Sequence, residues 1–424
     1  PTHRKKPGGF KIKTRPGKGR KRRIDVDGRP LESGLPLPDV FESCLPAFGG
    51  RFLRNFWRIL RRAVGEGCPI VLAVAGPVTV SDQHRVWLNR LLELGYVSIL
   101  SLTDAICYHD AHDIVSKGRP CFEIDPFGSD LKYRKERVVR VTDIGFREEL
   151  LARTDRLFSE ILLKPAFQRP LTNPEFRYLL GKELEGYEKE AGVKAGLLST
   201  AARMEVPVFC GAPADGSVFL EAVKLKMLAE LGEIPAFNFS LDLVGDVVEF
   251  AAYHYHGLFR METRKLAIIA LGGGVPKNYA LQPEPFLSQA LLLDRIAGYH
   301  YDMQIVSAPV TEGSLSSCWP SEAHTWGKVD ETYPVNSTSV PADYTMLIPF
   351  LVQALLQERG RLEAILNNDF KGNFARFKKA YPGEWGFLRA PLRLLTRRDD
   401  AIAELYKATK KKRRALKETL RYKG

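Results

Sequence analysis

The feature that most constrains the fold is a repeated alternation between short apolar runs and segments whose apolar residues recur at helical spacing. The run PIVLAVAG ends in a glycine, which is typical of a strand buried on both faces of a parallel sheet. Strands that alternate with helices of about ten to fifteen residues predict an α/β fold with a doubly wound, mostly parallel sheet. The expected strands cover 69–76, 96–103, 206–210, 265–274 and 301–308, and the expected helices include 52–64, 84–95 and 222–232.

The excess of positive charge lies at the two ends of the chain. Its 63 Lys and Arg residues exceed its 50 Asp and Glu residues, for a net charge of +13. Residues 1–23 hold 11 basic residues and no acid, and residues 407–423 hold 9 basic residues and 1 acid. The body from 24 to 406 keeps 43 basic and 49 acidic residues, a net charge of −6. We therefore expect no nucleic-acid surface on the body, whereas the ends are either solvated arms or non-specific contacts to RNA or ribosomes.

Three segments follow from composition. Residues 1–40 are rich in Gly, Pro and basic residues and predict a flexible arm. Residues 41–395 carry the alternating pattern and predict the α/β domain. Residues 396–424 predict a highly charged helix with few apolar positions, expected to extend beyond the core.

The sequence also predicts the environment of the protein. No run approaches the roughly 20 apolar residues that span a bilayer, and the first residues contain no apolar segment of a secretory signal. The 6 cysteines form no CxxC pair, so we expect free thiols in a reducing compartment and neither disulfides nor a zinc site. These observations predict a cytoplasmic globular protein without a membrane contact or a metal.

Small and acidic residues follow most of the apolar runs. In a doubly wound sheet, ligands bind at the carboxyl ends of the strands. The loops there include GPVTVSD, beginning at Gly76, and TDAICYHD, with Thr103 and Asp104. Small residues let backbone N–H groups approach a phosphate, and acids accept hydrogen bonds from ribose hydroxyls. The chain has no GxGxxG motif, so from this pattern alone a dinucleotide site and a set of ordinary tight turns both stay open.

Four blocks of sequence resemble the deoxyhypusine synthase family, and most of all its bacterial deoxyhypusine synthase-like branch. They are LTDAICYHDAHDIV (102–115), VPVFCGAPADGS (206–217), LGGGVPKNY (271–279) and EGSLSSCWPSEAHTWGKVDE (312–331). In that family a strand ends in GGG–K, and a later segment ends in E–x–x–x–W–G–K. The blocks occur in the order and spacing of the family, and the resemblance spans residues 70–355.

The resemblance implies an NAD-dependent aminobutyl transferase that forms a homotetramer with active sites between subunits. Lys328 matches the lysine that forms a covalent imine with the aminobutyl group. Glu322 and Trp326 match residues that hold the polyamine, and Lys277, Asn278 and His109 are expected to line the same site. Glu312 stands where the family usually has Asp. The expected cofactor contacts are Gly76, Thr103, Asp104, Asp215, Gly272, Gly273, Gly274, Ser307, Ala308, Glu312, Ser316 and Asp343.

The chemistry of these residue types fits such a reaction. Removing a hydride from the carbon next to an amine nitrogen creates an electrophilic imine. A lysine captures that carbon only as the neutral amine, so its pKa must fall well below its usual value of roughly 10.4. Burial and neighbouring cations such as Lys277 lower the pKa of Lys328. A tryptophan face and a carboxylate suit a flexible cationic amine, through cation–π attraction and a charge-assisted hydrogen bond.

Each residue also has a structural interpretation. Asp215 could cap a turn, and Lys277 is either a phosphate contact or simply exposed. Trp326 alone is more often packed in a core, and Glu322 alone is more often a solvated acid. His109 and His112 lie three residues apart without a convincing third and fourth ligand, so we expect them to line the site rather than bind zinc.

Three departures from the family limit the substrate. Asn278 stands where eukaryotic and archaeal members have His, and Leu220 and Leu315 stand where they have Asp. A buried ammonium without a paired acid costs several kcal/mol, so spermidine is not expected to be held as in the true synthase. The acceptor could be a free amine such as putrescine, giving homospermidine, or a protein lysine. The alternatives are an impaired member that acts as a scaffold anchored by its basic ends, and an ordinary dehydrogenase.

Overall fold

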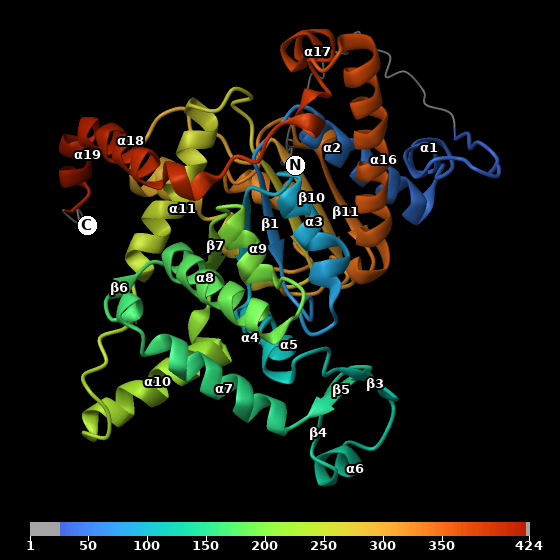
Figure 1. Cartoon of the computed structure of the whole chain (residues 1–424). Helices are drawn as coiled ribbons and strands as arrows, with labels where there is room; N and C mark the ends of the chain where they lie inside the picture. Colours follow the sequence, from blue (N-terminus) through green and yellow to red (C-terminus); the bar gives the residue numbers. More distant parts are fainter. Residues whose placement is uncertain (1–25, 421–424) are drawn as a thin grey trace, which may run out of the picture.

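The structure, a computed structural model, describes residues 26–420 and is built around one central sheet (Figure 1). Its six strands are all parallel, in the order β11-β10-β9-β1-β2-β7. The predicted α/β fold with a mostly parallel sheet is confirmed. The strands are β1 (Ile70–Val74), β2 (Ile99–Leu102), β7 (Val208–Cys210), β9 (Ala267–Leu271), β10 (Tyr301–Val306) and β11 (Ser337–Pro341).

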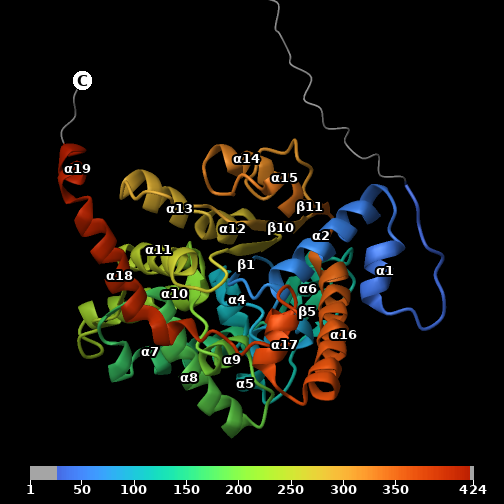
Figure 2. The same ribbon diagram turned by 90° about the horizontal axis from the view of Figure 1, so that it is seen from above.

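Side chains of β1 alternate between two hydrophobic cores, one on each face of the sheet. Leu72 and Val74 belong to the first core, together with apolar residues of α2 (Phe48–Gly65) and α16 (Tyr344–Phe370). Val71 and Ala73 belong to the second core, with residues of α11 (Leu243–Phe259). Figure 2 shows α16 and α11 on either side of β1. Helices therefore cover both faces, which explains why the strands read as continuous apolar runs.

Helices and helical turns connect the strands. Those not yet introduced are α1 (Leu37–Ser43), η1 (His84–Leu88), α3 (Asn89–Glu93), α4 (Asp104–His109), α5 (His112–Ser116), α6 (Asp130–Lys135), α7 (Glu149–Leu162), η2 (Pro165–Phe167), α8 (Asn173–Ala191), α9 (Leu197–Arg203), η3 (Pro213–Asp215), α10 (Ser217–Glu230), α12 (Gly274–Ala280), α13 (Pro283–Pro285), η4 (Phe286–Ala290), α14 (Pro320–Thr325), α15 (Tyr333–Asn336), α17 (Phe374–Ala380), η5 (Trp385–Leu388), η6 (Leu394–Arg397), α18 (Arg398–Lys411) and α19 (Arg413–Glu418). No helix in residues 26–420 combines the length and the apolar character that crossing a membrane requires.

Two smaller sheets stand apart from the central one. Strands β3 (Phe122–Glu123), β4 (Val138–Val141) and β5 (Ile144–Arg147) form an antiparallel sheet in the order β3-β5-β4. Strands β6 (Pro170–Leu171) and β8 (Ser240–Leu241) form a short parallel pair. Figure 1 shows the antiparallel sheet below the central sheet, close to α7.

The C-terminal segment packs more closely than its composition predicts. The sequence predicts that the segment from residue 396 onward extends beyond the core. In the structure, α18 lies along α11 and buries Ala401 and Leu405 in the second core. Glu404 accepts a hydrogen bond from His256 of α11 if that ring nitrogen carries the proton, at 3.1 Å. Ile402 and Ala408 pack against the same core, and Arg398 at the start of α18 forms an ion pair with the buried Glu249 of α11, so both apolar and charged contacts hold the helix. In α19 no residue is buried.

A buried acidic cluster joins α8 to the start of α9. Glu188 Oε1 accepts hydrogen bonds from the Gly196 N–H and the Ser199 hydroxyl, both at 2.8 Å. Nearby, the carboxylate of Asp110 accepts from the N–H groups of Leu197 and Leu198. Burial raises the pKa of Glu188 to about 7 and that of Asp110 to about 6, and the charge of Asp110 further opposes ionisation of Glu188.

This cluster predicts that stability falls as the pH rises. The folded state holds the proton of Glu188 more tightly than the unfolded chain does, so this contribution is complete below about pH 4.3 and is lost as the pH rises through about 7. Glu188→Gln removes the titrating group but keeps an acceptor for Gly196 and Ser199. Between pH 5 and pH 8 the wild type should lose about 2 kcal/mol of unfolding free energy that Glu188→Gln keeps. Urea denaturation of both proteins at the two pH values measures this difference. The exposed Glu190→Gln on the same helix should show no such difference from the wild type, and a parallel pH response in Glu188→Gln and wild type would contradict this prediction.

Candidate active site

The carboxyl ends of the central strands form one edge, and the chain reverses its strand order there. From β1 the order runs through β2 to β7 on one side and through β9 to β11 on the other, so the loops after β1 and β9 diverge. Such a switch point is where open α/β sheets bind their ligands. Gly76 follows β1 and Gly272 follows β9. The structure thus brings the predicted cofactor residues of these two loops to the switch point.

Close backbone packing at the switch point explains its glycines. Gly272 has φ +77°, a left-handed conformation that favours glycine, and its N–H donates to Ile305 O at 3.1 Å. A Cβ on Gly273 would lie 2.9 Å from the Cβ of Ala75, and one on Gly274 would lie 3.2 Å from the backbone nitrogen of Ser316. These three glycines let the loops after β1, β9 and β10 approach one another. Larger residues would push the loops apart.

Other predicted cofactor residues occupy the same edge. Thr103 begins α4 after β2, and Asp215 ends the exposed turn η3 after β7. Ser307 and Ala308 follow β10 directly. The exposed Asp343 begins α16 after β11, where its carboxylate accepts hydrogen bonds from the Thr345 N–H at 2.8 Å and hydroxyl at 2.6 Å. Glu312, in the loop after β10, accepts from the N–H and hydroxyl of Ser314.

A cavity of about 620 Å³ adjoins this edge. Its wall combines the loop that follows Gly76, the start of α16 and the small antiparallel sheet. Its polar lining includes Ser81, Gln83, Arg119, Glu123, Asp343 and Thr345. The small sheet therefore forms a cover beside the carboxyl edge, and it encloses a space large enough for part of a dinucleotide.

Lys328 and Asn278 lie together, as their common assignment to one site predicts. Lys328 Nζ donates to Asn278 Oδ1 across a long 3.4 Å and lies 5.6 Å from the centre of the Trp326 ring. Trp326 is 60% exposed, so one face of its ring is open to a ligand. Burial lowers the pKa of Lys328, while Cys318 and Glu284 act in the opposite direction. The arrangement favours the neutral amine that a nucleophilic lysine requires.

Lys277 fits neither of its expected roles, since it is neither exposed nor open to a phosphate. It is 3% exposed, and its ammonium donates three hydrogen bonds: to Gln304 Oε1 at 2.7 Å, to Leu315 O at 3.2 Å and to Cys318 O at 2.6 Å. All three protons of the ammonium are used. Burial lowers its pKa, which the nearby Asp302 opposes. Lys277 therefore ties the loop before α14 to β10, and a direct substrate contact would break these bonds.

Asp104 also differs from its expected role at the cofactor. It is completely buried and forms an ion pair with Arg177 of α8, which is 1% exposed. A Cβ on Gly216 would collide with the Asp104 carboxylate, so the loop after β7 covers it. Burial raises the pKa of Asp104, and the charge of Arg177 opposes that effect. The carboxylate holds α4 to α8 and does not face a ribose.

His109 lies in an aromatic cluster. Its Nδ1 is 3.4 Å from His112 Nε2, and its ring packs edge-on against His112 and Phe146. Burial lowers the pKa of His109 to about 4 and that of His112 to about 3, so both rings are neutral at physiological pH. No hydrogen bond or ring contact among the described residues joins His109 to Lys328. Residues 26–420 also contain no group of three or more metal-ligating side chains.

Of the residues at the departures from the family pattern, Leu220 and Leu315 are exposed, whereas Asn278 is half-buried beside Lys328. Leu220 is 57% exposed and Leu315 is 38% exposed. Glu221, next to Leu220, is buried and accepts a hydrogen bond from Ser159 at 2.6 Å, so it does not take the place of an acid at 220. Glu322 is exposed in the first turn of α14, on the segment that leads to Lys328.

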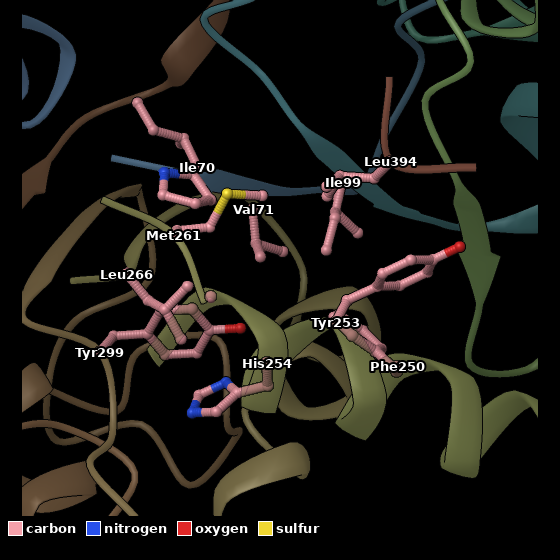
Figure 3. Close-up of a pocket in the computed structure, with 12 residues that line it drawn as sticks. Ile70, Val71, Ile99, Phe250, Tyr253, His254, Met261, Leu266, Tyr299 and Leu394 are labelled. Atoms are coloured by element: carbon pink, nitrogen blue, oxygen red, sulfur yellow. The ribbon is translucent and has the colours of Figure 1, made fainter. Parts of the chain in front are cut away.

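The apolar pocket in Figure 3 is not part of this site. It lies in the second core, beside the first residues of β1 and β2 and so at the opposite end of the strands. Its volume is about 10 Å³, room for one water molecule at most. His254 in its wall is held by Ala297 O at 2.9 Å, and burial lowers its pKa to about 4. This pocket is a packing defect next to a structural histidine.

Sequence reasoning missed one acid beside Lys328. Glu284 lies in α13 between two prolines and is 5% exposed, and its Oε2 has no hydrogen-bond partner. Its carboxylate lies against Gly327, the residue before Lys328. An acid in a PEP tripeptide is typical of a solvated loop. Glu284 precedes Lys328 by 44 residues, and only the folded chain brings the two segments together. No signal in the sequence could have identified it.

The sequence comparisons with known proteins agree on one family. The deoxyhypusine synthase family model matches residues 37–355. A deoxyhypusine synthase-like protein of Nostoc punctiforme is 32% identical over 331 residues, which cover 78% of this chain and 82% of that protein. One of Cyanothece sp. is 30% identical over 337 residues, which cover 78% and 81%. A crystal structure of a candidate deoxyhypusine synthase from Entamoeba histolytica aligns with 16% identity and a TM-score of 0.47, over 78% of this chain and 96% of that one.

Proposed function

The chain belongs to the deoxyhypusine synthase family, and we propose that it is an NAD-dependent aminobutyl transferase in which Lys328 carries the transferred group. The observation that carries this proposal is the environment of Lys328. Its amine is partly desolvated, has one long hydrogen bond and lies beside an exposed indole ring. A surface lysine without a chemical role would keep its ammonium in water.

The residues at the carboxyl edge fit NAD. Gly272, Gly273 and Gly274 place no side chain between the backbone of the switch point and a ligand, and the exposed carboxylates of Asp215 and Asp343 are available to ribose hydroxyls. Asp104 is not available to the ribose hydroxyls, because its carboxylate forms a buried ion pair with Arg177. Bound NAD would accept a hydride from the donor carbon next to nitrogen and return it at the end, so no net redox change is expected.

Side chains around Lys328 would bind the substrate amine and take part in the covalent step. Trp326 offers a face to the cationic amine, and the exposed Glu322 offers a charge-assisted hydrogen bond. Lys328 Nζ, as the neutral amine, adds to the electrophilic carbon, and the departing amine takes the proton that the lysine nitrogen loses. Asn278 Oδ1 orients the lysine amine from one side. A second amine then displaces Lys328 from the same carbon.

A small amine is the acceptor that this site favours. Leu220 and Leu315 supply no carboxylate for the far ammonium groups of a long polyamine. Without such partners a desolvated ammonium is costly, which favours a short diamine whose far end stays in water. Transfer of an aminobutyl group to putrescine would give homospermidine.

Assembly with copies of the chain is part of the proposal. Apolar side chains on α10 and α11, among them Val223, Met227, Leu243 and Val244, are exposed around an apolar groove of about 530 Å³. Such a surface supports a subunit interface. The homotetramer itself stays a prediction from the family.

Reductive trapping tests the proposed function. The purified protein is incubated with NAD and, in turn, spermidine, putrescine and agmatine; borohydride is added, and the intact mass is measured. The expected result is a mass gain equal to the reduced aminoalkyl adduct, mapped by peptide analysis to Lys328, with no more than one NADH formed for each trapped adduct. Absence of an adduct with every amine, although NAD is bound, would rule out the transferase. Accumulation of NADH in proportion to the amine consumed would indicate an ordinary dehydrogenase.

A further inference from the structure

Glu284 is a buried acid without a complete set of partners. It is 5% exposed, and its Oε2 accepts no hydrogen bond from the described residues. A buried carboxylate oxygen normally has at least one donor, because desolvation without compensation is costly. Ser288 lowers the pKa of the group, but burial outweighs this and raises it. A position that leaves an acid oxygen unsatisfied needs a reason beyond packing.

The carboxylate lies against the turn that precedes Lys328. A Cβ on Gly327 would lie 2.8 Å from Glu284 Oε2 and 3.1 Å from its Cδ. Gly327 also has φ +78°, so both its conformation and its missing side chain are required. The turn therefore closes directly over the acid.

The backbone of Lys328 is fixed while its amine is not. The Lys328 N–H donates to Ala323 O at 3.1 Å, and its carbonyl accepts from the Tyr299 N–H at 2.9 Å. The amine has only the 3.4 Å contact with Asn278 Oδ1. The titratable groups around it are Glu284 from α13, Cys318 from the loop before α14 and Lys277 from α12. Of these, Lys277 is fully engaged in three hydrogen bonds and Cys318 is a thiol, so Glu284 is the one carboxylate among them.

We propose that Glu284 is a positioning residue of the Lys328 site, whose carboxylate opposes, without cancelling, the loss of the lysine proton that burial favours, until substrate enters. This inference rests on the proposed function for its purpose, but the interaction itself exists without substrate. The negative charge attracts the ammonium through a low-dielectric environment and so opposes loss of its proton. Entry of a cationic amine beside Trp326 then adds a like charge and favours release of that proton to water, which reaches the half-buried Lys328.

The test measures the reactivity of Lys328 directly. The whole protein is labelled with a trace of acetic anhydride between pH 6 and pH 10, and the Lys328 peptide is quantified by mass spectrometry against the exposed Lys189 as an internal reference. Only neutral amines react. Glu284→Gln should make Lys328 react between about three- and tenfold faster near pH 7, because removing the charge favours the neutral amine. Glu284→Asp, which keeps the charge, should stay close to the wild type.

The control and the contrary results separate this inference from the proposed function. Glu331→Gln removes an exposed acid from the segment that carries Lys328 and should leave the labelling unchanged. Equal labelling of folded Glu284→Gln and wild type would overturn the role of Glu284, as would equal acceleration by Glu331→Gln. If Glu284→Gln does not fold, Glu284→Met, which also removes the charge, is labelled in its place, and a rate equal to that of the wild type would overturn the role of Glu284. Failure of reductive trapping alone would remove the transferase and leave the labelling result intact.

Discussion

Replacing Lys328 by arginine is expected to abolish the borohydride-trapped adduct and to reduce transferase turnover by at least about 10³-fold. Arginine keeps the positive charge and the approximate length of the side chain, but its guanidinium stays protonated and cannot act as a nucleophile. NAD binding should stay near the wild-type level, because the glycines of the switch point lie on other loops. Lys328 is only partly buried, so the free energy of unfolding should change by less than about 1 kcal/mol.

Mass spectrometry, a turnover assay and NAD titration check this prediction. Lys189→Arg, an exposed conservative change on α8, serves as the matched control and should behave like the wild type. A full adduct in Lys328→Arg would place the covalent step on another lysine. Loss of NAD binding together with the adduct would show that Lys328 supports the cofactor rather than the chemistry.

Removing Arg177 should have the largest effect on stability, a loss of about 3–5 kcal/mol in the free energy of unfolding for Arg177→Met. Methionine fills most of the space but leaves the completely buried Asp104 without its cation. The same loss should loosen the loop after β7, because Gly216 packs on Asp104. Urea denaturation measures the effect.

A double-mutant cycle separates the ion pair from packing. Asp104→Asn alone leaves Arg177 buried and unpaired, so it should also destabilise the protein. The double variant should lose clearly less than the sum of the two single losses, because neither charge is then stranded. Additive losses would show that the two side chains stabilise the fold separately.

The strands could be predicted from the sequence wherever both faces of the sheet are apolar. β11 was missed because its sequence STSVP contains no apolar run. Thr338 and Ser339 are nevertheless buried there, and Ser339 accepts a hydrogen bond from Gln304 Nε2 at 2.7 Å. A neighbouring side chain thus compensates the polar groups of this strand. That partner lies on another strand, so no local pattern reveals it.

The candidate site was predicted in outline but not in detail. Apolar runs and the family motifs indicate which loops meet at the carboxyl edge, and Lys328 and Asn278 do lie together. They do not indicate which way a loop side chain turns. Asp104 turns inward because Arg177 is buried beneath it. Lys277 turns inward because two backbone carbonyls and a side-chain amide oxygen accept hydrogen bonds from its ammonium group. Both partners come from distant positions, so only the folded chain decides these roles.

The arrangement of the central strands has a consequence for biosynthesis. Val71 of β1 pairs with Ile268 of β9, and the Tyr344 hydroxyl donates to Ala75 O at 3.0 Å. A ribosome must therefore translate β2, β7 and the helices that follow them before β1 gains its neighbour β9 at the switch point. Until then the apolar edge of β1 is unprotected in the nascent chain. Contacts between segments this far apart in the sequence raise the contact order of the fold, so we expect it to fold slowly.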